Sequence, residues 1–181
     1  VTDMVNMFNT ASSFNQPIAN WDVSGVANMY AMFYYTSAFN QPIGNWNVSN
    51  VTNMSYMFFN ASSFNQPIGN WDVSSVTNMH SMFSAASSFN QPIGDWDVSS
   101  VTEVYNMFNT ATSFNQDISS WCVTNISSEP SGFSVSSPLT QSNKPIWGTC
   151  SSFGINDQSQ SDISIYPNPV IDKLFIQGLS N

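Results

Sequence analysis

The chain has very few positive charges, and this absence limits what it can bind. Its basic residues are Lys144, Lys173 and a single histidine, His80, and the formal net charge is −9. Proteins bind nucleic acid through lysine and arginine side chains that displace counterions from the phosphates. We therefore expect no nucleic-acid partner, and anionic membrane surfaces are disfavoured for the same reason.

Long apolar runs and a signal peptide are also missing. No apolar stretch reaches the ~20 residues that a membrane-spanning helix requires, and no basic segment followed by an apolar one opens the chain. The sequence therefore predicts no transmembrane segment. Leucine is scarce as well, since it occurs only at Leu139, Leu174 and Leu179.

The composition is nevertheless that of a chain able to bury a core. Charged residues make up 7% of the sequence, against a typical ~25%, while 41% of residues are hydrophobic. The apolar set is dominated by 14 Phe, 9 Met and 6 Trp. Global disorder is excluded by this content, and the unusual choice of apolar residues indicates a periodic constraint.

A repeat of 25 residues supplies that constraint. The segment "FNQPIGNWDVSSVTNM" recurs without gaps, and a partial unit, residues 1–13, precedes the first complete one. The five Phe-Asn-Gln starts are at Phe14, Phe39, Phe64, Phe89 and Phe114. Periods of 20 to 29 residues are typical of leucine-rich-repeat coils, so we expect a repeat solenoid.

Spacing within the unit predicts the elements of one coil. Trp21, Val23 and Val26 fit short extended segments, because alternation with period two marks a strand. Met29, Met32 and Phe33 stand at i, i+3 and i+4, which fits a helical or 3₁₀ turn. The predicted fold class is therefore a leucine-rich-repeat-like solenoid of short β-strands and helical or 3₁₀ turns. The first unit carries no cap, so we also expect repeats before residue 1.

The repeat region, residues 1–126, resembles the BspA-like bacterial surface proteins, whose repeats follow the pattern "FNQPIGNWDVSSVTNM..MF". The resemblance implies a cell-surface or secreted bacterial protein that mediates adhesion to host or neighbouring-cell molecules. It implies no catalytic residues.

A second resemblance lies in the tail, where "ISIYPNPVIDKLFIQ" spans residues 163–177. This stretch resembles the start of the C-terminal sorting domain of type IX secretion, which implies contact with the secretion machinery. The motif residues are Tyr166, Pro167, Asn168, Pro169, Asp172 and Leu174. The family's domain is longer than residues 162–181, so we expect a truncated sorting domain here.

The segment between these regions divides into a cap, residues 127–153, and a polar linker, residues 154–161. Cys122 stands where the earlier units carry Asp or Asn, so the first thiol comes where the repeat degenerates. With the export that the resemblance implies, an even cysteine count favours a Cys122–Cys150 disulfide that pins the cap. Free thiols are the open alternative. Two cysteines alone cannot complete a tetrahedral metal site, and we expect no metal.

Aromatic residues at the variable positions of the repeat are the candidate ligand-binding set. They are Tyr30, Tyr34, Tyr35, Tyr56, Phe59 and Tyr105. If exposed, they form a strip suited to contact with an extracellular protein or glycan, although Phe59 also fits an extension of the core.

Two polar columns have a structural and a functional interpretation. The column of Asp22, Asn47, Asp72 and Asp97 fits turn capping better than a calcium site, because calcium loops cluster several ligands within a few residues. For the asparagine columns that start at Asn15 and Asn28, hydrogen bonding to buried backbone groups is favoured over sugar binding.

We expect no enzyme and no cofactor. His80 has no periodic partner, and the paired carboxylates Asp95 and Asp97 fit turn positions. The sequence thus favours a non-catalytic repeat protein, surface-displayed or secreted, that mediates adhesion or protein–protein interaction. The alternative is an accessory carbohydrate-binding or spacer module of a larger secreted enzyme.

Overall fold

The computed structural model describes residues 1–150, 165–167 and 174–176 of the chain. The chain divides into two compact units, residues 1–151 and residues 152–181. The predicted linker, residues 154–161, and the motif residues Asn168, Pro169 and Asp172 lie outside the described residues.

Regular secondary structure is scarce in the described residues. The 3₁₀ helix η1 spans Gln141–Asn143, and the strands β1, Ile165–Pro167, and β2, Leu174–Ile176, pair antiparallel. Tyr166 and Pro167 of the predicted sorting motif lie in β1, and Leu174 lies in β2. None of the helices in this part of the chain has the length and apolar character to cross a bilayer.

The predicted fold class is therefore wrong. Residues 1–140, all described, contain no helix and no strand, so the units are not the expected solenoid coils of β-strands and helical or 3₁₀ turns. The β-type pairing between units is limited to isolated parallel bridges, which run Asp3 to Asn28, Asn28 to Asn53, Asn53 to Asn78 and Asn78 to Glu103. Of the partial β sorting domain that the sequence predicts, the described residues contain only the short pair β1 and β2.

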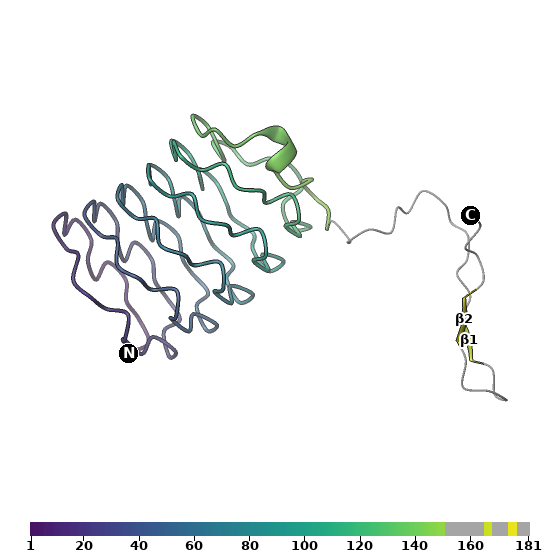
Figure 1. Cartoon of the computed structure of the whole chain (residues 1–181), viewed down its shortest axis with the longest axis horizontal. Coiled ribbons are helices and arrows are strands. Elements are labelled where there is room, and N and C mark those ends of the chain that lie inside the picture. The colour runs from purple at the N-terminus through teal and green to yellow at the C-terminus, as the bar shows by residue number, and fades with distance from the viewer. Residues whose placement is uncertain (151–164, 168–173, 177–181) are drawn as a thin grey trace. The chain divides into compact units, whose positions relative to one another are not determined.

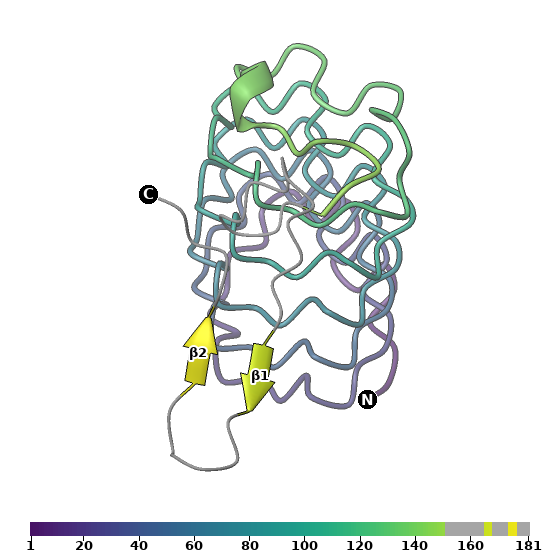
Figure 2. The same ribbon diagram turned by 90° about the vertical axis from the view of Figure 1, so that its right-hand side faces the viewer.

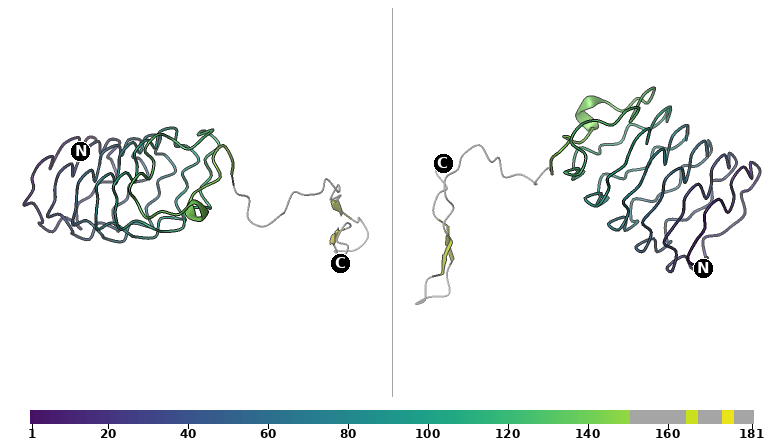
Figure 3. Two further views of the ribbon diagram at one scale, coloured as in Figure 1. Left: turned by 90° about the horizontal axis from the view of Figure 1, so that it is seen from above. Right: turned by 180° about the vertical axis from the view of Figure 1, so that it is seen from behind.

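The repeats instead stack as consecutive turns, which Figure 1 and both views of Figure 3 show as a row of similar loops. Around Met29–Tyr35, successive backbone N–H groups donate alternately within their own unit and to the next unit. The Met32 N–H donates to the Met29 carbonyl at 3.2 Å, which closes a turn within the unit, whereas the Phe33 N–H donates to Met57 of the next unit at 2.9 Å. Because one N–H in two leaves the unit, neither a helix nor a continuous strand ladder can form.

Left-handed backbone explains why the Met29, Met32 and Phe33 spacing does not produce a helix. Ala31 has φ 51° and Tyr35 has φ 55°, and a right-handed helix cannot continue through such residues. Both positions recur in every unit. The left-handed residues are Asn6, Ala31, Tyr56, Ser81 and Asn106 in one column, and Thr10, Tyr35, Asn60, Ala85 and Thr110 in the other.

The core lies inside the stack, whose successive layers Figure 2 shows obliquely, with the cap at the top. Phe58 stacks on Phe33 of the preceding unit, with ring centroids 5.5 Å apart, and on Phe83 of the next unit at 5.6 Å. All three side chains are fully buried. One column of phenylalanines therefore continues through the units and joins them, as expected for side chains that recur once per unit.

The tryptophan column adds a polar contact to this packing. Trp46, Trp71, Trp96 and Trp121 are buried, and the Trp71 Nε1–H donates to the Ile43 carbonyl of the preceding unit at 3.1 Å. Trp21, in the first complete unit, is 39% exposed. The expected column of buried indoles is thus present for four of the five residues.

The segment after the fifth Phe-Asn-Gln start continues the stack and closes it. The Ile118 N–H donates to Asn143 at 2.9 Å, and the Val123 N–H donates to Thr149 at 2.8 Å. Cys122 and Cys150 form a disulfide. Phe133 is buried against the last repeat, so residues 127–150 cover the apolar end that the stack would otherwise expose.

Candidate functional site

Five of the six candidate binding residues come together on one surface. They form a continuous set of contacts, which we call the aromatic cluster: Tyr30, Tyr34, Tyr35, Tyr56 and Phe59. The Tyr30 and Tyr56 rings lie 5.7 Å apart, and Tyr34 stacks on Phe59 at 4.9 Å with an interplanar angle of 16°. Residues of two neighbouring units thus build one surface.

Tyr105 lies apart from the aromatic cluster and is linked to it by the only histidine. The Tyr56 hydroxyl and His80 Nε2 are 2.9 Å apart, and the His80 ring lies 6.2 Å from that of Tyr105. His80 was not among the predicted binding residues. Its place in the same variable column as Tyr30 and Tyr105 was the signal in the sequence that could have identified it.

The repeat separates buried apolar positions from the exposed positions that carry these aromatic side chains. Met29, Met32 and Phe33 point into the core and are fully buried, whereas Tyr30 and Tyr35 are 37% and 42% exposed. Phe59 is only half-buried, so it belongs to the surface contacts and does not simply extend the core. The period of the repeat and the left-handed turns together decide which aromatic residues face solvent.

The aromatic cluster is electrically neutral. Partial burial raises the pKa of the Tyr34 hydroxyl above its ordinary value, and the neighbouring Tyr35 and Tyr56 add to this effect. The hydroxyl therefore stays protonated at neutral pH. Beside the cluster lies an open hollow of about 390 Å³, lined by Asn6, Asn9, Tyr30, Ala31, Tyr34 and Tyr56.

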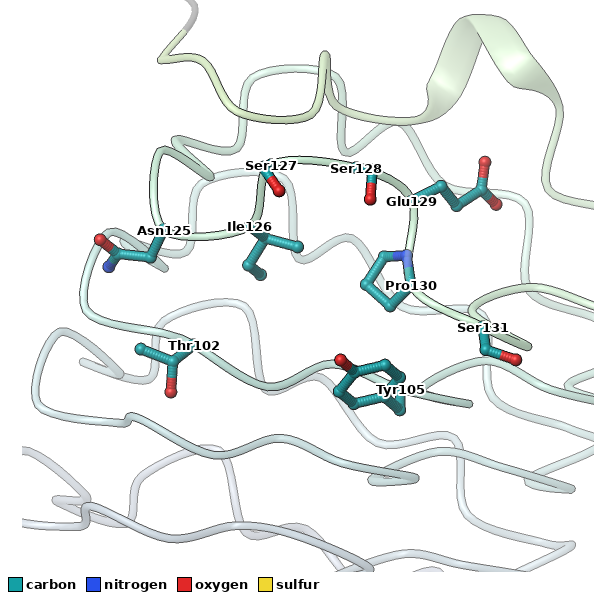
Figure 4. A pocket seen from close by; sticks show the side chains of 9 residues that line it. All are labelled: Thr102, Tyr105, Asn125, Ile126, Ser127, Ser128, Glu129, Pro130 and Ser131. Atoms are coloured by element: carbon teal, nitrogen blue, oxygen red, sulfur yellow. The ribbon is translucent and has the colours of Figure 1, made fainter.

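A second hollow lies where the last repeats meet the cap (Figure 4), and we call it the polar hollow. Its volume is about 290 Å³. It is lined by Thr102, Tyr105, Asn125, Ile126, Ser127, Ser128, Glu129, Pro130 and Ser131. In Figure 4, Thr102 and Tyr105 occupy one side, and the segment from Asn125 to Ser131 forms the opposite side. The sequence pointed to Tyr105 but not to the cap residues.

The Asp and Asn column caps turns, as expected. Asp72 Oδ1 accepts hydrogen bonds from the Ser74 N–H at 3.1 Å and the Ser74 hydroxyl at 2.6 Å. Asn47 makes the equivalent pair of bonds with Ser49. The serine bonds lower the pKa of Asp72, as corresponding bonds do for Asp22 and Asp117. No three His, Cys, Asp or Glu side chains gather into a metal-binding group among the described residues.

The Asn15 column also serves the backbone. Asn40 Oδ1 accepts hydrogen bonds from the Asn65 N–H and from Gln66 Nε2, each at 3.0 Å. The same pattern joins Asn65 to Asn90 and Gln91 of the following unit. The Asn28 column works within its own unit, where Asn28 Oδ1 accepts from the Tyr30 N–H at 3.0 Å. Both columns satisfy N–H groups that would otherwise lack a partner in the turns.

These features define a repeat protein built from stacked 25-residue units, with an exposed aromatic cluster and a capped end. One family model matches residues 1–73 and residues 42–147, and its description is "Mycoplasma protein of unknown function, DUF285". The matches cover most of the chain, so the chain belongs to this family. They do not extend to residues 163–177, which carry the resemblance to the sorting domain. No curated protein and no solved structure matches the chain.

Proposed function

We propose that this chain is a non-catalytic, surface-displayed or secreted bacterial repeat protein that binds another protein through its aromatic cluster. The observation that carries this proposal is the contrast between two sets of aromatic residues. The repeated phenylalanines and tryptophans are buried in the core, whereas the aromatic residues at non-repeating positions gather at the surface. Exposed tyrosines are enriched in protein–protein interfaces and among the residues that dominate their binding energy.

The ring geometry favours a protein partner over a glycan for this cluster. Tyr34 and Phe59 stack on each other, and Tyr35 lies 5.5 Å from Phe59. Sugars bind aromatic residues through an open ring face, and here Tyr34 and Phe59 each cover one face of the other. Their edges and the Tyr30 and Tyr35 hydroxyl groups remain for a protein surface, where an aromatic side chain with a polar tip is well suited.

Export is the second part of the proposal. The Cys122–Cys150 disulfide fits an oxidising compartment, which is where structural disulfides persist. The resemblance of the repeats to BspA-like proteins and of residues 163–177 to a type IX sorting domain supports the same location. Protease treatment of intact producing bacteria tests it: loss of the antibody signal without cell lysis is expected, and full protection would contradict surface display.

The binding experiment uses residues that the repeat already accepts. Ser84 occupies the position of Tyr34 and Phe59 in the next unit, so a Tyr34→Ser, Phe59→Ser double variant removes two rings without a foreign residue. The matched control is Asn50→Ser, since Ser75 occupies that position one unit later. Each purified protein is tested against a panel of immobilised extracellular proteins by biolayer interferometry.

We expect at least one protein of the panel to bind the parent chain and the control equally, and the double variant about tenfold or more weakly. Each variant must unfold at the temperature of the parent chain, so that a lost signal reports lost contact. Equal binding by the double variant would remove the aromatic cluster from the function. Absence of binding across the panel would contradict the proposed interaction role.

A further inference from the structure

The polar hollow exists because the repeat register changes by one residue at the cap. Within the repeats, the Ser81 N–H donates to Tyr105, 24 positions later, and the Phe83 N–H donates to Met107, again 24 positions later. The equivalent bonds at the cap run from Asn106 to Ser131 and from Phe108 to Phe133, a spacing of 25. One additional residue is therefore accommodated before Ser131, and the chain loops away from the last repeat.

This loop interrupts the hydrogen bonds between units. The Thr77 carbonyl accepts from the Thr102 N–H at 2.9 Å, and the Met79 N–H donates to Glu103 at 2.9 Å. One unit later, the Thr102 carbonyl and the Val104 N–H have no hydrogen-bond partner among the described residues. An acceptor and a donor that face the next layer everywhere else in the stack are thus left for solvent or a ligand.

The segment from Asn125 to Ser131, on the side of the polar hollow opposite Thr102 and Tyr105 (Figure 4), is fixed by hydrogen bonds and an ion pair. The Ile126 N–H donates to Val123 at 3.0 Å, and the Phe133 N–H donates to Pro130 at 3.1 Å. Lys144 Nζ lies 2.6 Å from Glu129 Oε1, which ties the middle of the loop to the cap. A preformed site of this kind binds a ligand without a large loss of conformational entropy.

The groups around the polar hollow combine an aromatic ring with many hydroxyls. Tyr105 is 46% exposed, and its one ring neighbour among the described residues is His80, tilted by 47°, so the Tyr105 ring is not stacked. The hydroxyls of Ser127, Ser128 and Ser131 make no hydrogen bond to protein in the described part of the chain. Each of these hydroxyls both donates and accepts.

Charge distinguishes between the possible ligands. Lys144 is the single lysine or arginine in residues 1–150, and it is paired with Glu129, so no free cation attracts a phosphate, sulfate or carboxylate. One paired carboxylate does not make a site for a divalent cation, which prefers six or more oxygen ligands. A neutral ligand rich in hydroxyl groups fits the remaining donors and acceptors.

We propose that the polar hollow binds a neutral pyranose unit of a glycan. The Tyr105 ring stacks against the C–H face of the sugar, because the negative face of an aromatic ring attracts polarised C–H groups. The serine hydroxyls, the Thr102 carbonyl and the Val104 N–H bond to the sugar hydroxyls. This site does not depend on the proposed protein partner, since it uses none of the residues of the aromatic cluster.

The probe is an array of neutral, sialylated and sulfated glycans, screened with the full chain and followed by calorimetry with the strongest free oligosaccharide. Tyr105→Ala removes the stacking surface and should weaken binding about tenfold. Thr52→Ala is the matched control, because the Thr52 hydroxyl donates to the preceding unit at 3.2 Å, as that of Thr102 does, but only Thr102 lines the polar hollow. Deletion of Ser128 restores the repeat register and should close the site.

The expected result is binding to neutral glycans that Tyr105→Ala and the Ser128 deletion weaken and that Thr52→Ala leaves within about twofold of the parent. Thermal unfolding of each variant confirms that it is folded. The proposal is overturned if no neutral glycan binds, if charged glycans are preferred, or if Tyr105→Ala binds as the parent does. Loss of protein binding in the Tyr34→Ser, Phe59→Ser variant has no bearing on any of these outcomes, so the two proposals fail separately.

Discussion

Replacing Trp71 by alanine tests whether the buried indole column holds the units together. The Trp71 side chain is 3% exposed, packs 6.4 Å from the Phe58 ring and donates from Nε1 to the Ile43 carbonyl of the preceding unit. The substitution removes the indole from the middle of the stack, where both neighbouring units are in place. A cavity and the loss of a contact between units both follow.

The expected loss in the free energy of unfolding follows from the area that the Trp71 indole buries. An indole buries about 200 Å², which at about 25 cal/mol per Å² corresponds to about 5 kcal/mol as an upper value. Measured Trp-to-Ala changes in protein cores cost about 3–5 kcal/mol. Loss of the indole hydrogen bond does not raise the cost above this range. The Ile43 carbonyl keeps the bond from the Trp46 N–H and is therefore not left without a partner.

Trp21→Ala is the matched control, since it is the same substitution in the same column. Trp21 is 39% exposed, so its indole buries only about 120 Å² and the same coefficient gives about 3 kcal/mol as an upper value. Both variants are unfolded in urea and followed by the fluorescence of the remaining tryptophans. Circular dichroism in the peptide region is less informative for a chain with so little helix and strand. A loss of stability in Trp71→Ala no larger than in Trp21→Ala would refute the reasoning.

Three further predictions concern register, the cap and acid stability. One glycine inserted after Ser74 should shift every later column and lower the unfolding temperature, because each unit contacts only its neighbours; unchanged unfolding would contradict the stacked packing. Cys122→Ser combined with Cys150→Ser should cost about 3–4 kcal/mol in the chain-entropy model, and denatured, unreduced parent chain should show no reactive thiol. Asp72→Asn should flatten the loss of stability below pH 3.8, the ordinary carboxyl pKa.

The acid prediction follows from the direction of the pKa shift. The folded pKa of Asp72 lies below its ordinary value because Ser74 donates to the carboxylate, so its contribution to stability is complete above the unfolded pKa and is lost as the pH falls through the folded one. Asn47 makes the same bonds without titrating, so Asp72→Asn keeps the turn. An unchanged acid limb of the stability curve in Asp72→Asn would show that this carboxylate does not contribute.

Much of the candidate site could be predicted from the sequence. Tyr30, Tyr34 and Tyr35 stood out because they interrupt a repeat whose other aromatic residues recur every 25 positions. Periodic residues pack on one another, and residues that vary between units need not. The polar hollow could not be predicted, because it depends on a shift of one residue between hydrogen-bonded units that lie far apart in sequence.

The sequence by itself determined the period, the composition of the core and the polar columns that cap the turns, since each depends on which residue recurs at which position. Only the tertiary structure decided the backbone conformation. Met29, Met32 and Phe33 have the spacing of a helix, but the same spacing also suits a series of turns around Ala31. The choice between them depends on where each N–H finds its acceptor, and here every second acceptor belongs to the next unit.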